Sequence, residues 1–165
     1  MSIAEQTEIR IGTVADVHDI MSQLSNTYEE MGFSNISPEK VLREVYSALS
    51  LDRGIFGLIG KPGETIQAGV LLRIGNPWYS EDNVVEERGI FVHPDFRSGR
   101  LGLARKLCDF SKKFADDMGL PLIVGIQSTS KIAPKIRLYE RAFGEQRGAF
   151  FVYNMKKEHL TRQEH

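Results

Sequence analysis

Cysteine and closely spaced histidines are almost missing from this sequence. The single cysteine among the 165 residues, Cys108, excludes an intrachain disulfide framework and a cysteine-based zinc site. The four histidines are far apart in the chain, at His18, His93, His159 and His165. We therefore expect no metal site, and an unpaired cysteine is typical of a reducing compartment.

Long apolar runs and an excess of one charge are missing as well. No apolar run approaches the length of a membrane-spanning helix, and the first residues, MSIAEQTEIRIG, lack the apolar stretch of a signal peptide. With 21 basic and 22 acidic residues, the formal net charge is −1. Basic residues gather between Arg97 and Lys106, but this short cluster lacks the continuous basic face that a nucleic-acid surface needs. We expect a cytoplasmic protein with neither a membrane nor a nucleic-acid partner.

The motifs of several common enzyme classes are also absent. There is no G-x-G-x-x-G after the first strand of a βαβ unit, and no Walker A motif. No Ser-His-Asp or Cys-His arrangement is evident, so we do not expect a covalent enzyme nucleophile.

Hydrophobic periodicity predicts one α/β domain over residues 1–165, with a core at 8–155 and a polar tail at 156–165. Helices are expected over residues 15–31, 37–51, 99–118 and 134–143. Strands are expected over residues 8–14, 54–60, 65–75, 84–92, 122–127 and 148–155.

The order of these elements predicts a mixed sheet. The strand, helix, strand unit from 84 to 127 predicts a parallel pair, and the earlier hairpin predicts antiparallel neighbours. The short apolar run at 122–127 is typical of a strand covered on both faces. The strand at 148–155 is expected near a sheet edge, and such an apolar edge favours a homodimer.

The segment VHPDFRSGRLGLARKL, residues 92–107, joins a strand to a helix through a basic, glycine-containing loop. Ligands of α/β sheets gather at the carboxyl ends of parallel strands, beside helix N-termini that offer free N–H groups. Gly99 and Gly102 carry no side chain that would keep an anion from the backbone. The loop therefore predicts a phosphate-binding site, and the alternative is a plain strand–helix connection.

The segment IFVHPDFRSGRLGLA is similar to the L-x-V-x-P and [QR]-x-x-G-x-[GA] motifs of the GNAT superfamily of acyl-CoA-dependent N-acyltransferases. The order of elements resembles that fold over roughly residues 8–155. The resemblance implies a single-domain, mixed and mostly antiparallel sheet with a splayed parallel central strand pair, flanked by about four helices. One departure is Arg100, which stands where the family usually has glycine and would either crowd the pyrophosphate or contact it. Alternatively, the loop shifts its register to use Gly99.

This resemblance implies acetyl-CoA as cosubstrate, with its pantetheine arm between the two splayed strands. Backbone pairing to the pantetheine falls on Phe91 and Val92, and less directly on Ile90. The pyrophosphate is expected at the loop that comprises Arg97, Ser98, Gly99, Arg100, Leu101, Gly102 and Leu103. The alternative for Arg97 is a surface ion pair with Asp95.

Amide formation needs a neutral amine, a base that removes its proton and an acid that protonates the leaving thiolate. Counted back from the motif arginine, Glu86 falls where several family members carry a base glutamate, so the resemblance implies that role here. Glu87 points to the opposite face unless a bulge intervenes. The alternative for Glu86 is an ion pair with Arg88 at a solvated strand start.

IRLYERAFG, residues 136–144, is similar to the L-Y-x-x-x-G-F text of a later family helix. The resemblance implies that Tyr139 donates a proton to the CoA sulfur, which suits a phenol with an ordinary pKa of about 10. Ile132 replaces a common asparagine, and Phe143-Gly144 inverts the usual pair. The alternative for Tyr139 is a packing residue, and the helical spacing of Cys108 predicts a core residue.

The leading function is an N-acetyltransferase that moves the acetyl group of acetyl-CoA to a primary amine, of a small molecule or a protein, in a ternary complex. Trp78 and Tyr79, with two acids nearby, suit a cationic amine. The alternative for these aromatics is a lid that packs on the first helices. The alternative function is an acyl-CoA-binding module without turnover.

Overall fold

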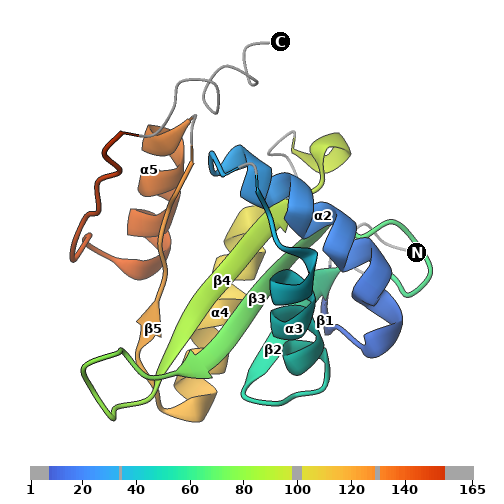
Figure 1. Cartoon of the computed structure of the whole chain (residues 1–165), viewed down its shortest axis with the longest axis horizontal. Coiled ribbons are helices and arrows are strands. Elements are labelled where there is room, and N and C mark those ends of the chain that lie inside the picture. The colour runs from blue at the N-terminus through green and yellow to red at the C-terminus, as the bar shows by residue number, and fades with distance from the viewer. Residues whose placement is uncertain (1–7, 34, 98–101, 129–130, 155–165) are drawn as a thin grey trace.

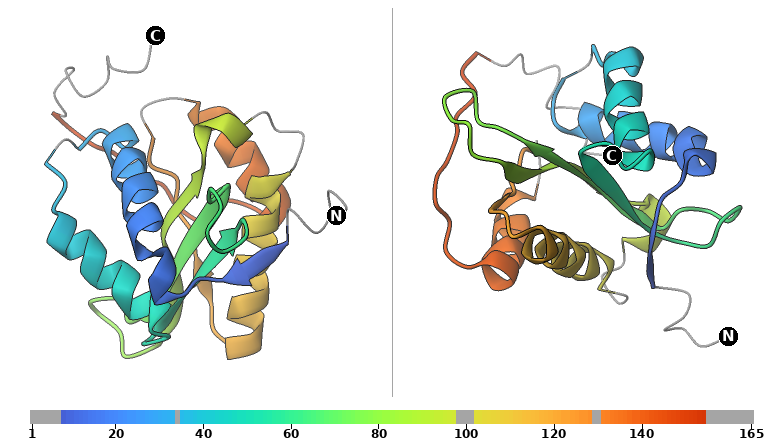
Figure 2. Two further views of the ribbon diagram at one scale, coloured as in Figure 1. Left: turned by 90° about the vertical axis from the view of Figure 1, so that its right-hand side faces the viewer. Right: turned by 90° about the horizontal axis from the view of Figure 1, so that it is seen from below.

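A five-stranded sheet with helices on both faces forms the centre of the protein (Figures 1 and 2). The computed structural model describes residues 8–33, 35–97, 102–128 and 131–154. The strands are β1 (Ile9–Ile11), β2 (Gly54–Ile59), β3 (Ala68–Gly75), β4 (Val84–Val92) and β5 (Leu122–Ile123). The helices are α2 (Val17–Glu30), α3 (Pro38–Leu49), α4 (Leu103–Met118) and α5 (Ile132–Phe143), with short 3-10 helices η1 (Val14–Asp16) and η2 (Pro94–Phe96). The four predicted helices are present, although the start expected for α4 at residue 99 lies outside the described residues.

The start of α3 follows from its sequence. Ser37 is the N-cap, and its hydroxyl accepts a hydrogen bond from the backbone N–H of Lys40. Pro38 takes the first helical position, where its missing N–H would have had no helical partner. The predicted helix start at Ser37 is therefore confirmed.

The strands are hydrogen-bonded in the order β1-β2-β3-β4-β5, and the first four are antiparallel. β4 and β5 run parallel, but their pairing covers only Val85 with Leu122 and Glu86 with Ile123. Beyond that point the two chains separate (Figure 1). The predicted strand over 122–127 was too long, and the prediction that it is covered on both faces was wrong, since Ile123 is 49% exposed.

A β-bulge interrupts the pairing of β3 with β4. Leu71 lies opposite Gly89, whereas Leu72 lies opposite Glu87, so Arg88 is the extra residue. An extra residue shifts the alternation of side chains by one position along the rest of the strand.

The bulge decides which β4 side chains face which helices. Val85, before the bulge, packs in the cluster under α4, and Ile90 and Val92, after it, pack on that same cluster. Gly89 and Phe91 face the opposite layer, where a Cβ at Gly89 would lie against Leu24 and Tyr28 of α2. Without the extra residue, positions 85 and 91 would share a face.

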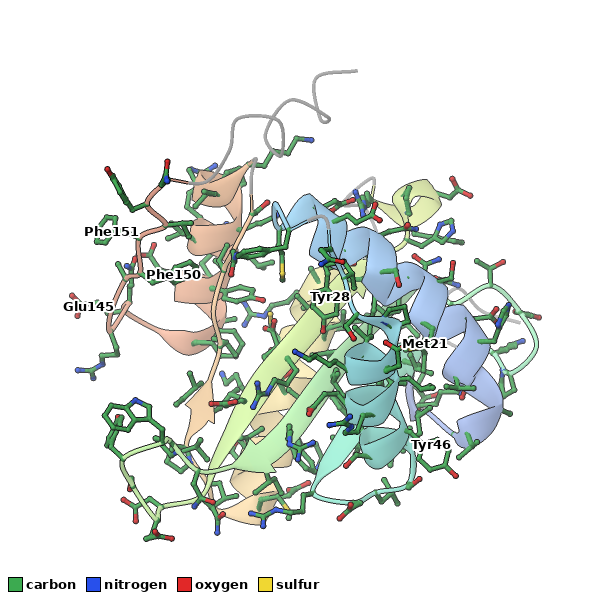
Figure 3. All side chains as sticks on the ribbon, in the orientation of Figure 1. Met21, Tyr28, Tyr46, Glu145, Phe150 and Phe151 are labelled. Atoms are coloured by element: carbon green, nitrogen blue, oxygen red, sulfur yellow. The ribbon has the colours of Figure 1, made fainter. Side chains whose placement is uncertain are left out.

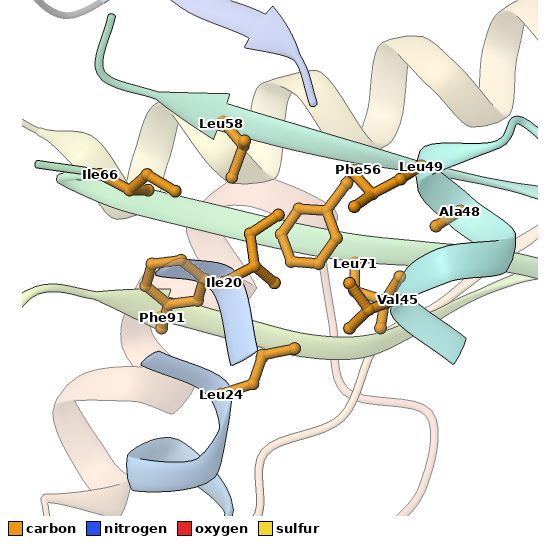
Figure 4. Close-up of a cluster of buried hydrophobic side chains, with 10 residues drawn as sticks. All are labelled: Ile20, Leu24, Val45, Ala48, Leu49, Phe56, Leu58, Ile66, Leu71 and Phe91. Carbon is orange, nitrogen blue, oxygen red and sulfur yellow. The ribbon is translucent and has the colours of Figure 1, made fainter. Parts of the chain in front are cut away.

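Two hydrophobic clusters stabilise the sheet, one on each face. The cluster under α2 and α3 (Figure 4) comprises Ile20, Leu24, Val45, Ala48, Leu49, Phe56, Leu58, Ile66, Leu71 and Phe91. The cluster under α4 comprises Ile55, Ile59, Ala68, Val70, Leu72, Val85, Leu103, Leu107 and Ala115. Burial of this apolar surface is the main force that holds the three layers together.

The predicted strand at 148–155 is not formed in its described part, residues 148–154. This segment follows α5 and lies on the outer side of that helix, as the labelled Phe150 and Phe151 show (Figure 3). Phe151 and Tyr153 are 94% and 96% exposed. A strand needs a neighbouring edge, and the segment lies away from the sheet; within the described residues β5 is therefore an edge strand and not a central one.

Candidate active site

The point where β4 and β5 separate brings three elements together. Glu86 and Ile123 form the last register pair of the two strands, so Glu87 is the first residue of β4 beyond it. The described chain from 124 to 128 forms no strand and leads towards α5 (Figure 1). The backbone of β4 past Glu87 therefore has no parallel strand beside it within the described residues.

Glu87 and Tyr139 meet at this point. The phenol O–H of Tyr139, from α5, donates a hydrogen bond to Glu87 Oε2 at 2.8 Å. Phe143, one helical turn further along α5, holds the Tyr139 ring in an edge-to-face contact, with ring centroids 5.3 Å apart. Both members of the hydrogen bond are half-buried.

Burial is the largest influence on the pKa values of Glu87, Tyr139 and Cys108. It raises the pKa of Glu87 to about 7, against the lowering effect of the hydrogen bond from Tyr139. Burial and then the Glu87 charge raise the pKa of Tyr139, so the phenol is protonated at neutral pH. The neighbouring Cys108 of α4 is buried, as predicted, and its pKa is raised to about 12. A neutral, buried thiol does not act as a nucleophile.

Glu86 faces the other layer of the molecule. It lies opposite Arg73 of β3, and Arg73 pairs with Glu44 of α3 at 3.0 Å. Its own carboxylate pairs with Arg88 at 2.8 Å, so the ion pair considered as an alternative from the sequence is present. The structure thus places Glu86 and Tyr139 on opposite faces of β4, and it places Glu87 against Tyr139.

Arg97 lies just beyond the end of β4 and ties this end to α2. Its Nε donates to the carbonyl oxygen of Val92 at 2.8 Å, and its Nη2 pairs with Glu30 at 3.1 Å. The alternative pairing of Arg97 with Asp95 is therefore wrong; Asp95 instead donates its backbone N–H to His93 Nδ1.

The N-terminus of α4 follows the predicted phosphate loop. Gly102 is its N-cap, with a left-handed φ of 59° that favours glycine, and no side chain caps the helix there. Among the described residues, a Cβ at Gly102 would meet no atom within 4 Å. Leu103 is buried under the sheet. The other loop predictions, Ser98, Gly99, Arg100 and Leu101, lie outside the described residues.

The hydrogen bonds of β4 show which backbone groups face its open side. His93 donates its N–H to Gln67 of the segment before β3. Because backbone groups of a strand alternate in direction, the groups of Phe91 face β3 as well, and those of Ile90 and Val92 face away from it.

Basic residues distant in the sequence lie within electrostatic reach of one another at this end of the sheet. Lys135 of α5 donates to Ser128 at 2.8 Å, and burial lowers its pKa. Glu30 raises the pKa of Lys135, whereas Arg97 and Lys131 lower it. The site therefore combines cations from η2 and α5.

The two aromatic residues before β4 do not form the lid considered from the sequence. Trp78 is 96% exposed, and Tyr79 packs edge-to-face on it with ring centroids 5.5 Å apart. Glu81 and Asp82 follow in the same exposed loop.

Two contacts of the site were not predicted, those of Glu87 with Tyr139 and of Glu30 with Arg97. The adjacent pair Glu86-Glu87 carried a signal for the first, because side chains alternate along a strand and the two acids must face opposite sides of β4. No local pattern joins Glu30 to a residue 67 positions later.

The part of the chain that the structure describes contains no group of three or more His, Cys, Asp or Glu side chains arranged to hold a metal ion. None of its helices combines the length and apolarity needed to span a membrane.

Several solved structures share this fold at low sequence identity. An integron cassette protein from the mobile metagenome of Cole Harbour Salt Marsh is 22% identical, with a TM-score of 0.66, over 93% of this chain and 91% of that one. AAC(6')-Iy in complex with the bisubstrate analogue CoA-S-monomethyl-acetylneamine is 14% identical, with a TM-score of 0.68, over 91% and 98% of the two chains. The aminoglycoside acetyltransferase meta-AAC0020 from an uncultured soil metagenomic sample, in complex with sisomicin, is 16% identical, with a TM-score of 0.64, over 94% and 100%.

No curated protein matches the sequence. Residues 19–144, which include β4, the N-terminus of α4 and Tyr139, match the sequence model of the acetyltransferase (GNAT) family. This match covers more than half of the chain and contains the motifs on which the resemblance was based. The chain belongs to the GNAT acetyltransferase family.

Proposed function

We propose that this protein is an N-acetyltransferase that transfers the acetyl group of acetyl-CoA directly to a primary amine. The observation that carries the proposal is the hydrogen-bonded pair Glu87–Tyr139 at the point where β4 and β5 separate. It sets a protonated phenol beside the edge of β4 that has no partner strand within the described residues. Family membership supports acyl transfer as the reaction class.

The described residues fit a CoA molecule at this edge. The backbone groups of Ile90 and Val92 face the open side of β4 and offer pairing to the pantetheine amides, whereas those of Phe91 face β3. The open space over Gly102 leaves the first N–H groups of α4 accessible to a pyrophosphate. Arg97 adds a cation but holds the Val92 carbonyl, so full pantetheine pairing requires Arg97 to turn towards the phosphates.

In the proposed reaction the amine attacks the thioester carbonyl within a ternary complex. Backbone N–H groups on the open side of β4 polarise that carbonyl. Glu86 removes the amine proton through water from the α3 side of β4, and Tyr139 protonates the leaving thiolate from the opposite side, where α5 lies. The buried thiol of Cys108 takes no part, because it stays neutral.

The acceptor is proposed to be a cationic small-molecule amine. Trp78 and Tyr79 are free to stack on such a ligand, and Glu81 and Asp82 supply opposite charge in the same loop. Two of the similar structures, both of aminoglycoside acetyltransferases, hold sisomicin or the bisubstrate analogue CoA-S-monomethyl-acetylneamine.

Calorimetric titration with acetyl-CoA, followed by thiol release with sisomicin, a polyamine and a lysine-containing peptide, tests the proposal. Binding of acetyl-CoA together with amine-dependent thiol release is the expected result. Binding of acetyl-CoA without thiol release in the presence of any of the three acceptors would favour an acyl-CoA-binding module. No binding of acetyl-CoA would exclude both functions.

A further inference from the structure

The Glu87–Tyr139 hydrogen bond uses the one proton that Tyr139 has to give. A phenol carries a single O–H, and here it points to Glu87 Oε2 at 2.8 Å. An ionised carboxylate only accepts hydrogen bonds. As long as Glu87 is ionised, the Tyr139 proton is therefore held between the two side chains and is not directed at a sulfur atom.

A protonated Glu87 reverses this arrangement. Its carboxyl O–H then donates to the Tyr139 oxygen, and the phenol O–H is free to rotate towards a thiolate on the open side of β4. We infer that Glu87 is a positioning residue that, in its neutral form, orients the Tyr139 proton and then replaces it. The inference rests on the proposed function.

The transfer balances without any further reactant. The Tyr139 O–H bond breaks and an S–H bond forms on the leaving thiolate. At the same time the Glu87 carboxyl proton moves to the tyrosine oxygen, which leaves neutral Tyr139 and a Glu87 carboxylate. The carboxylate regains a proton from solvent after the products leave, while the proton lost by the amine goes to the base.

The surroundings of Glu87 keep its neutral form accessible. The titratable groups that face it are Tyr139 from α5 and Cys108 from α4. The phenol of Tyr28 from α2 is also close enough that, besides burial, the Glu87 charge raises its pKa. Within the described residues no lysine or arginine forms an ion pair with Glu87, whereas Glu86 pairs with Arg88. Burial without a cation raises the pKa of Glu87 to about 7, so both forms are populated at neutral pH.

The pH profile of kcat tests this role, with acetyl-CoA and an accepted amine. In the wild type, kcat is expected to fall about tenfold between pH 6 and pH 8, as Glu87 loses its proton. In Glu87→Gln the amide NH₂ donates to Tyr139 at every pH. That variant should keep its pH 6 rate at pH 8. Glu140→Gln, an exposed neighbour of Tyr139 on α5, should retain the wild-type fall.

A second measurement needs no substrate. The ¹³C shift of the Glu87 side-chain carboxyl should titrate near pH 7 in the wild type and higher in Tyr139→Phe, which loses the hydrogen bond. A wild-type and a Glu87→Gln enzyme with the same alkaline fall would overturn the inference and leave the proposed function intact. Absence of thiol release from every amine would instead remove the proposed function itself.

Discussion

Arg97 joins Glu30 of α2 to the end of β4, with an ion pair of 3.1 Å on one side and a hydrogen bond to the Val92 carbonyl on the other. This arginine stands five residues before Gly102, the N-cap of α4. We propose that it exchanges the Glu30 carboxylate for a phosphate when acetyl-CoA binds.

The affinity for acetyl-CoA should therefore depend on both partners of this ion pair. Arg97→Ala is expected to weaken binding about tenfold, because it removes a cation from the phosphate site. Glu30→Gln is expected to strengthen binding a few-fold, because it removes a competing carboxylate. Calorimetric titration gives both constants, and tighter binding by Arg97→Ala would contradict this role.

The two ends of α4 offer a matched test of the pyrophosphate site. Gly102 and Gly119 have nearly the same left-handed backbone, with φ of 59° and 65°, and a Cβ at either one meets no atom within 4 Å. Glutamate at either position should cost about 1 kcal/mol of folding free energy, from backbone strain. Only Gly102→Glu should abolish acetyl-CoA binding, because its charge lies at the helix N-terminus.

Thermal unfolding and calorimetry on Gly102→Glu and Gly119→Glu separate stability from binding. Equal loss of acetyl-CoA affinity in both variants would mean that the ligand does not bind at the start of α4.

Tyr139→Phe should lower kcat about 100-fold or more and leave the dissociation constant of acetyl-CoA almost unchanged. The ring and its contact with Phe143 remain, so the fold should be preserved. Tyr46→Phe, at an exposed position on α3, is the control and should behave as the wild type. A Tyr139→Phe enzyme with full kcat would show that the thiolate takes its proton from elsewhere.

Asp16 should make stability sensitive to acid. Its buried carboxylate accepts two hydrogen bonds from Arg10, at 2.7 and 2.9 Å, and one from the Thr13 backbone. These bonds, that from Arg10 first, lower its pKa from the ordinary 3.8. A carboxylate with a lowered folded-state pKa stabilises the protein above its unfolded pKa, and this contribution is lost as pH falls below about 4.

Asp16→Asn should reduce the free energy of unfolding at pH 7 by about 1.5–3 kcal/mol and flatten its dependence on acid pH. Urea unfolding between pH 3 and pH 7 measures both effects, and Asp116→Asn on exposed α4 surface serves as the control. An unchanged acid dependence in Asp16→Asn would show that another group causes it.

We propose that the exposed apolar segment before the C-terminal tail forms the interface of a homodimer. Phe151 and Tyr153 are almost fully exposed, and Phe150 and Val152 are about half exposed, so four apolar side chains in a row lie at the surface. Sedimentation should show a dimer in the wild type and a monomer in Phe151→Glu. A single 18.6 kDa species at high concentration in the wild type would end this proposal.

The sequence alone predicted much of the fold, because helix periodicity, caps and turns are local signals. The pair Ser37-Pro38 predicted the start of α3, and VVEERGIFV predicted β4 with its observed bounds. The last strand failed because its apolar alternation says nothing about whether a neighbouring edge is within reach.

The candidate site was only partly predictable. The sequence motifs identified Arg97, Gly102 and Tyr139, because the chemistry of an arginine, a glycine and a tyrosine can be inferred from the residue type. Their partners depend on distant elements, since Glu30 is on another helix and Glu87 faces Tyr139 across 52 positions of sequence.

By itself, then, the sequence determined the elements as far as α5, their order and the family, because these depend on neighbouring residues and short motifs. Only the tertiary structure decided which of two adjacent glutamates meets Tyr139. The alternation along β4 turns Glu87 and not Glu86 towards α4 and α5, and the separation of β5 after Ile123 leaves room there for α5 to place Tyr139 against it. That choice depends on the packing of four elements, which no local pattern encodes.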